Sequence, residues 1–151
     1  MKQKKDWVIL SHLRKDARKS LVKLSNETGI PASTIYDRVN THEKGIIKRY
    51  TALLDFNKMG FYGRVYVAIK LNDSKKRDEL FNFLREHKSV NSLYRINFGY
   101  HLLFEAIFKD VAEADSFIAD VQHRFGINEH QIFNVIEEIK KEDFLTENAS
   151  P

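Results

Sequence analysis

The chain has 151 residues, and 42% of them are hydrophobic, which provides enough apolar material for one ordinary domain or two small ones. No apolar run approaches the roughly 20 residues that cross a bilayer, and the N-terminus lacks the apolar stretch of a signal peptide. The absence of cysteine excludes disulfides and thiolate metal ligands. We therefore expect a cytoplasmic protein with no membrane partner.

The net charge of +4 is unevenly distributed. Residues 1–60 hold 13 Lys or Arg against 6 Asp or Glu, whereas residues 61–151 hold 12 against 15. A basic N-terminal part beside a mildly acidic remainder indicates a module that binds a polyanion, joined to one that binds a partner or a ligand.

The first expected helix starts at Asp6, a plausible N-cap. Apolar residues then recur at helical spacing, and they would cover the back of the next two helices: Trp7, Ile9, Leu10, Leu13 and Ala17. Ser20 opens a second short helix with Leu21 and Leu24 on one face.

A tight turn and a third helix follow. Gly29 tolerates a left-handed backbone at a helix end, and Pro31 favours a turn or a helix start. From Ser33 to Glu43, Ile35 and Val39 lie four residues apart on the inner face. The outer face then holds mostly polar side chains: Ser33, Thr34, Tyr36, Asp37, Arg38 and Asn40. This pattern predicts a helix-turn-helix that could read DNA, and it equally fits an ordinary helical hairpin.

After Gly45 the pattern changes. Residues 46–54 are rich in β-branched and aromatic side chains, which predicts a strand with no partner nearby in the sequence. We expect this strand to pair with its copy in a second subunit. The domain boundaries that follow are 1–45 for a helix-turn-helix domain, 46–62 for the connector, 63–142 for a second domain and 143–151 for a polar tail.

The second domain has the predicted order β-α-β-β-α-β, the ferredoxin-like arrangement of an α+β protein. Strands are expected from Gly63, at 90–98, at 101–108 and at 132–139, with Asp73 and Asp110 near helix starts and Gly126 at a helix end. The face with Tyr66, Ala68, Tyr94 and Ile96 looks too apolar for water, so we expect a homodimer through the sheet.

The order of these modules resembles the Lrp/AsnC family of transcriptional regulators over nearly the whole chain. The first helix resembles that family through Asp6, Ile9 and Leu10 with Asp16-Ala17-Arg18, and the hairpin does so through Gly29-Ile30 and Ser33-Thr34-Ile35 with Arg38-Val39. The connector residues 45–60 add a third similar stretch. The resemblance implies a (winged) helix-turn-helix domain, a homodimer that often assembles into tetramers or octamers, and an amino-acid effector bound between dimers.

Carried over by position, the DNA-facing helix holds Ser33, Thr34, Tyr36, Arg38 and Asn40, with Asp37 beside them. By charge, Lys19, Lys48 and Arg49 are candidates for phosphate contact. The expected effector loop contributes Asn97, Gly99, Tyr100 and His101, although a simple hairpin turn explains Tyr100 and His101 as well.

Two departures from the family pattern stand out. His42 occupies a position that is usually apolar, which leaves the end of the recognition helix open. The loop Asn97–His101 lacks the acid that the family commonly carries there, so we expect weak binding of a free amino acid.

Three other functions have weaker support. An enzyme would need an anion-binding loop or a nucleophile beside a base, and Gly63-Arg64-Val65 is too sparse for that. The open sheet face could stack RNA bases, but the positive charge lies in the other module. The six histidines lack the spacing of a metal site, so we interpret them as surface residues and predict no cofactor.

Overall fold

The structure is a computed structural model, and it describes residues 4–146. Within that range the chain divides into two compact units. One unit holds residues 4–53 and 139–146, and the other holds residues 54–138. Among the described residues, no helix combines the length and the apolar character that crossing a bilayer requires.

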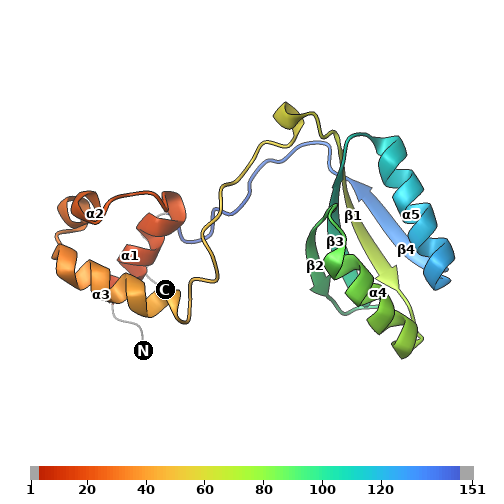
Figure 1. Ribbon diagram of the computed structural model, residues 1–151, viewed down its shortest axis with the longest axis horizontal. Coiled ribbons are helices and arrows are strands. Elements are labelled where there is room, and N and C mark those ends of the chain that lie inside the picture. Colours follow the sequence, from red (N-terminus) through yellow and green to blue (C-terminus); the bar gives the residue numbers. More distant parts are fainter. Residues whose placement is uncertain (1–3, 147–151) are drawn as a thin grey trace. The chain divides into compact units, whose positions relative to one another are not determined.

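Three helices build the N-terminal unit, and Figure 1 labels them α1 (Lys4–Lys15), α2 (Leu21–Thr28) and α3 (Ala32–Glu43). The buried core of this unit comes from α1, α2, α3 and the turn before α3: Ile9, Leu24, Ile30 and Ile35. Leu21 and Val39 pack against that core. The apolar spacing of the sequence therefore identified the inner faces of α2 and α3 correctly.

Both ends of α2 have the predicted capping residues. The Ser20 hydroxyl accepts a hydrogen bond from the Lys23 backbone N–H at 3.2 Å, which satisfies one donor at the start of α2. Gly29 has a φ of 69°, a left-handed conformation that ends α2 without steric strain.

The prediction that Asp6 caps α1 was wrong, because Asp6 lies inside that helix and is buried.

The connector is not a strand in this structure. Residues 46–54 form neither helix nor strand, and only the short 3₁₀ helix η1 (Asn57–Met59) interrupts the segment that leads to Gly63. A strand needs a hydrogen-bonded neighbour, and every strand described in the chain pairs within one sheet that leaves this segment out. A composition rich in β-branched residues is thus insufficient by itself to predict a strand.

The C-terminal unit has the predicted β-α-β-β-α-β order (Figure 1). Its elements are β1 (Gly63–Lys70), α4 (Ser74–Glu86), β2 (Val90–Arg95), β3 (Leu102–Phe108), α5 (Val111–Phe125) and β4 (Glu129–Asn134). The strands form one antiparallel sheet in the order β2-β3-β1-β4. Asp73 and Asp110 cap α4 and α5, and Gly126 ends α5, as expected.

Two strand boundaries differ from the prediction. β2 ends at Arg95, because the loop that reverses the chain begins with the exposed Asn97 and with Phe98 at a φ of 58°. β4 begins three residues earlier and ends at Asn134, because its pairing with β1 runs from Glu129 to Asn134. The apolar Ile136 and Ile139 therefore lie outside the sheet and are exposed.

One face of the sheet forms the core with α4 and α5. Alternate residues of β1 and β3 point into it, including Val67 and Phe104, and they meet Leu84 of α4 and Ile118 of α5. The opposite face is not covered by a helix. Register places a row of Tyr94, Leu103, Ala68 and Gln131 across that open face, followed by a row of Ser92, Glu105, Tyr66 and Phe133.

Candidate nucleic-acid interface

The outer surface of α3 carries most of the side chains predicted to contact DNA. Ser33, Tyr36 and Asp37 are exposed, whereas Thr34 and Asn40 are partly buried. Pro31 is the N-cap and offers no side-chain hydrogen bond to the first turn of α3. Because the first N–H groups of a helix attract anions, this end of α3 suits a phosphate.

Arg38 takes part in a buried ionic cluster. Its Nη1 atom donates to both carboxylate oxygens of Asp6, at 2.9 and 3.1 Å. His42 lies one turn further along α3, and its Nε2 is 3.1 Å from Asp6 Oδ1. Asp6 is 4% exposed and His42 is 5% exposed, while the Arg38 side chain is partly exposed, so a largely buried polar cluster joins α1 to α3.

This cluster accounts for the histidine at a usually apolar position. His42 is buried against a carboxylate rather than lying on the surface, so the interpretation of all six histidines as surface residues was wrong. A signal was present in the sequence. Arg38 and His42 are four residues apart on one helix face, and both require an acceptor when they are buried. The helix itself ends at Glu43.

The three predicted phosphate contacts differ in their surroundings. The side chain of Lys19 is 10% exposed, and its Nζ lies 2.6 Å from Glu27 Oε2 and 3.3 Å from His12 Nδ1. The hydrogen bond from Lys19 lowers the pKa of Glu27. Lys48 and Arg49 are both exposed on the segment after α3. Lys19 is therefore committed to holding α2, whereas Lys48 and Arg49 face solvent.

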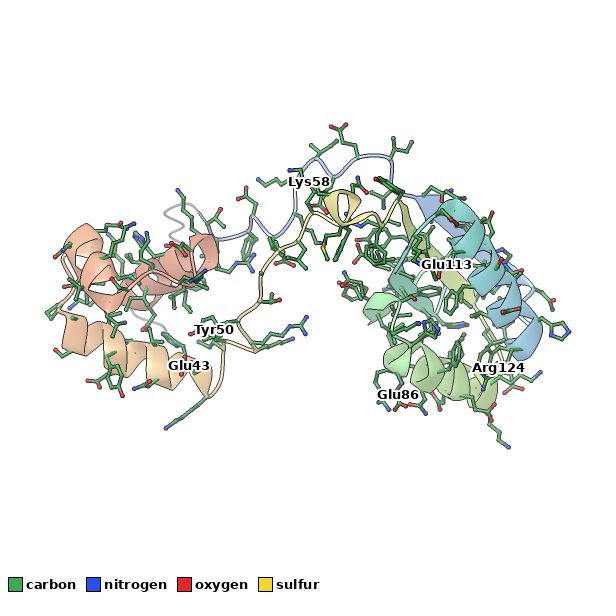
Figure 2. All side chains as sticks on the ribbon, turned by 45° about the horizontal axis from the view of Figure 1, so that its top comes forward. Glu43, Tyr50, Lys58, Glu86, Glu113 and Arg124 are labelled. Carbon is green, nitrogen blue, oxygen red and sulfur yellow. The ribbon has the colours of Figure 1, made fainter. Side chains whose placement is uncertain are left out.

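A tyrosine fixes the start of the connector to α3. Figure 2 shows Tyr50 beside Glu43, and the Tyr50 hydroxyl donates to Glu43 Oε1 at 2.9 Å. Burial and this hydrogen bond raise the pKa of Tyr50 to about 12. The backbone N–H groups of residues 45–47 also bond to the His42 carbonyl. These bonds order the chain that presents Lys48 and Arg49.

The predicted effector loop is a hairpin turn that His101 attaches to β1. The His101 backbone N–H donates to the Ile69 carbonyl at 2.8 Å, and its Nδ1 accepts from the Leu71 N–H at 3.1 Å. Tyr100 is partly buried, whereas Asn97 and Gly99 are exposed. His101 thus has a structural role at this turn, and the assignment of the loop to an effector stays a prediction.

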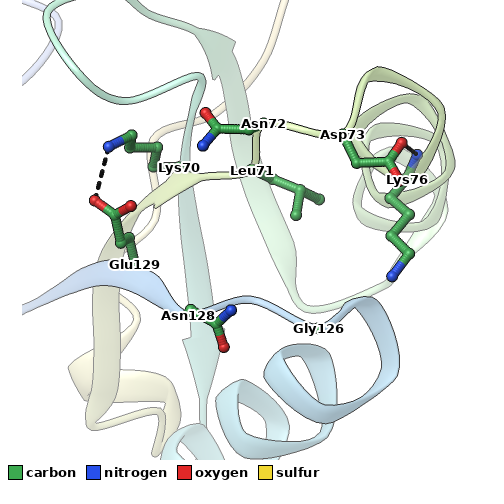
Figure 3. Close-up of a pocket in the computed structure, with 8 residues that line it drawn as sticks. All are labelled: Lys70, Leu71, Asn72, Asp73, Lys76, Gly126, Asn128 and Glu129. Carbon is green, nitrogen blue, oxygen red and sulfur yellow. Dashed lines mark hydrogen bonds and ion pairs between the residues drawn. The ribbon is translucent and has the colours of Figure 1, made fainter.

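A shallow hollow of about 230 Å³ lies elsewhere in the C-terminal unit, and Figure 3 shows its lining. Its lining residues are Lys70, Leu71, Asn72, Asp73, Lys76, Gly126, Asn128 and Glu129. Three of its charged residues already have partners, since Lys70 pairs with Glu129 at 2.8 Å and Asp73 caps α4. None of the predicted effector residues lines this hollow.

Comparison with known proteins identifies the class first. Residues 2–48 match a family described as winged helix-turn-helix DNA-binding. The uncharacterized HTH-type transcriptional regulator PH1055 of Pyrococcus horikoshii is 31% identical over 114 residues, which cover 73% of this chain and 70% of the relative. A second regulator of that organism, PH1692, is 28% identical over 94% of this chain and 95% of its own.

Solved structures share the complete fold. The regulator NMB0573 of Neisseria meningitidis, in complex with L-Met, superposes with a TM-score of 0.85 at 23% identity, over 93% of this chain and 94% of that one. An AsnC family regulator of Agrobacterium tumefaciens gives a TM-score of 0.81 at 24% identity, again over 93% and 94%. The chain therefore belongs to a family of HTH-type transcriptional regulators and has the Lrp/AsnC fold, which confirms the resemblance seen in its sequence.

The ionic cluster predicts a large stability effect at Asp6. Replacing Asp6 by Ala leaves the partly buried Arg38 and the buried His42 without their shared carboxylate, and loss of a hydrogen-bond partner at such sites costs roughly 1–3 kcal/mol. Chemical unfolding followed by the fluorescence of Trp7, the single tryptophan, measures this loss in the N-terminal unit.

Asp37→Ala is the matched control, because it removes an exposed carboxylate from α3. We expect it to change the free energy of unfolding by less than about 0.5 kcal/mol. Equal unfolding midpoints for the two variants would show that the cluster does not stabilise the unit.

Proposed function

We propose that the protein binds double-stranded DNA in a sequence-specific manner as a homodimer, and that α3 enters the major groove. The observation that carries this proposal is the helix-turn-helix itself. Its inner face is a closed core, and its outer face presents Ser33, Tyr36 and Asp37 to solvent. Side chains of this kind bond to base edges and phosphates.

The open face of the sheet supports the homodimer. Tyr94 and Phe133 are about half exposed there, and Leu103 lies between them in the sheet. Solvent-exposed aromatic groups on an uncovered sheet favour burial against a second copy. A twofold axis would use the same face of both copies and would also offer residues 46–54 a strand partner.

Selection of bound sites from random duplex DNA, together with mass measurement of the protein alone, tests this function. A twofold dimer should enrich a near-palindromic site with half-sites about one helical turn apart or a multiple of it. A monomer mass at micromolar concentration would contradict the dimer. A pool without any enriched sequence would contradict the specific reading of DNA.

Arg38 is the side chain that we propose reads a base, while Asp6 holds part of its guanidinium. Arg38→Ala should relax preference at one position of each half-site by roughly 1–3 kcal/mol. Competition over single-base variants of the selected site measures this. Asp6→Asn is the control, since it perturbs the cluster and retains the arginine. If Arg38→Ala lowers affinity equally for every variant, Arg38 contacts a phosphate and does not read a base.

Lys48 is proposed to contact a phosphate. Lys48→Gln should weaken binding to all sequences alike and should reduce the slope of log affinity against log salt by about one. Lys58→Gln removes an exposed lysine, which pairs with Asp55, from the C-terminal unit and should leave the slope unchanged. Equal slopes for the Lys48 variant and the wild type would show that Lys48 does not contact a phosphate.

The L-Met complex of the Neisseria regulator makes an amino-acid effector a finer question for this chain, and the resemblance seen in the sequence would place it at Asn97–His101. The loop has no carboxylate for the ammonium group, so we expect no micromolar binder among the twenty amino acids. Calorimetric titration measures this. A micromolar heat signal that Tyr100→Ala abolishes would show that the loop binds amino acids without an acid.

A further inference from the structure

The segment that follows the sheet returns to the DNA-binding unit. Residues 139–146 belong to the same compact unit as the three helices, although the sheet unit lies between them in the sequence. Arg14, in the last turn of α1, is the point of attachment. We call residues 139–146 the C-terminal segment.

Arg14 holds this segment with all three of its guanidinium nitrogens. Nε donates to the Phe144 carbonyl at 3.0 Å, Nη2 to the Glu142 carbonyl at 2.9 Å, and Nη1 to Glu142 Oε2 at 3.0 Å. Two of the three acceptors are backbone oxygens, so the contact fixes the path of the chain and not only a side chain. A planar fork of donors is well suited to several acceptors at once, which a lysine cannot reproduce.

The segment has a defined conformation of its own. Glu142 and Leu145 have φ values of 53° and 68°, which residues other than glycine rarely adopt. Local bonds support these turns, since Thr146 Oγ1 donates to Asp143 Oδ1 at 2.6 Å and Lys140 pairs with Asp143 at 2.7 Å. Unfavourable backbone conformations persist where the surroundings determine them.

The other end of the segment is attached to the sheet. The Val135 N–H donates to the Arg64 carbonyl, and the Arg64 side chain pairs with Glu138. Only four residue steps separate Glu138 from Glu142, so the chain between these attachments spans at most about 14 Å. The connector is bonded to α3 as far as Tyr50, and the Tyr62 N–H bonds to the Lys109 carbonyl, so twelve steps remain between these bonds and could extend to about 40 Å.

We propose that the C-terminal segment is a second tether of the DNA-binding unit, and that Arg14 is the positioning residue that closes it. The first linker alone would let the helix-turn-helix move over a wide range. The second tether limits that range to the length of a few residues. In a dimer this restriction sets the separation of the two recognition helices, so it determines the half-site spacing that the protein accepts.

This inference rests on the proposed DNA-binding function. It also implies that Arg14 does not contact a DNA phosphate, although Arg14 is a basic residue of the DNA-binding unit. A residue that neutralised a phosphate would contribute to the salt dependence of binding. A residue that closes a tether would instead contribute to the discrimination between spacings.

Full-length wild type and Arg14→Ala are compared on the selected site and on duplexes whose half-sites are moved apart by one and two base pairs. The affinity of the wild type should fall roughly tenfold when the spacing is altered, which is comparable with the effect of one mismatched base pair. Arg14→Ala should lose most of that penalty and keep the wild-type salt slope. Arg18→Ala removes the same charge from an exposed position after α1 and should retain the penalty.

A thermodynamic cycle tests the tether without DNA. Arg14→Ala, a chain ending at Glu138 and the combined variant are unfolded with Trp7 fluorescence as the signal. Both single changes should lower the stability of the N-terminal unit, and the combination should add little, because both break the same contact.

Additive losses in the cycle, or an Arg14→Ala variant with a reduced salt slope and an unchanged spacing penalty, would overturn the tether. Failure of the wild type to select any site would overturn the proposed function alone. The unfolding cycle would then still decide whether Arg14 closes the second tether.

Discussion

The orientation of α3 depends on one buried carboxylate. Asp6 lies in the first turns of α1 and binds Arg38 and His42, which lie one turn apart on α3. Removing a carboxylate from water is costly, and the cost is offset only when good hydrogen bonds surround it. That requirement restricts the orientations that α3 can take against α1. A rotation of α3 that moved Arg38 or His42 away would leave a buried charge unsatisfied, so the outer face of α3 has one preferred direction.

The C-terminal unit contains a second buried carboxylate on its open sheet face. Glu105 is 1% exposed and accepts from Arg64 at 2.6 Å, from Asn91 at 2.6 Å and from Ser92 at 3.1 Å. Burial works against the charge of Arg64, yet its bonds to Glu138 and Glu105 leave the pKa of Arg64 above its ordinary value. The apolar residues of that face surround a polar centre that is satisfied within one chain. A second copy could therefore cover the face without stripping water from an unpaired charge.

Much of the fold could be predicted from the sequence, because period and capping are local. The inward positions Leu24 and Ile35, the caps Asp73 and Asp110, and the order of the sheet elements all follow from neighbouring residues. The connector could not be predicted in the same way, since a strand depends on a partner that the local sequence does not contain. The partners of Asp6 and Arg14 were missed for a related reason. These contacts join residues 32 to 130 positions apart, and no spacing rule connects such positions.

The charge imbalance of the sequence acquires a different meaning once the partners are known. Residues 1–60 carry an excess of seven positive charges, and that excess suggested a polyanion partner. Yet Arg14, Lys19 and Arg38 are all bound to carboxylates within the N-terminal unit. These ion pairs help to maintain the shape of the unit, so phosphate contacts by Arg14 or Lys19 would break them, and the base contact proposed for Arg38 has to coexist with its bond to Asp6. Under the proposed function, the attraction to DNA would fall mainly to exposed cations such as Lys48 and Arg49, on the ordered segment after α3. Net charge thus indicates the partner, while the pairing of individual charges decides which residues are available to bind it.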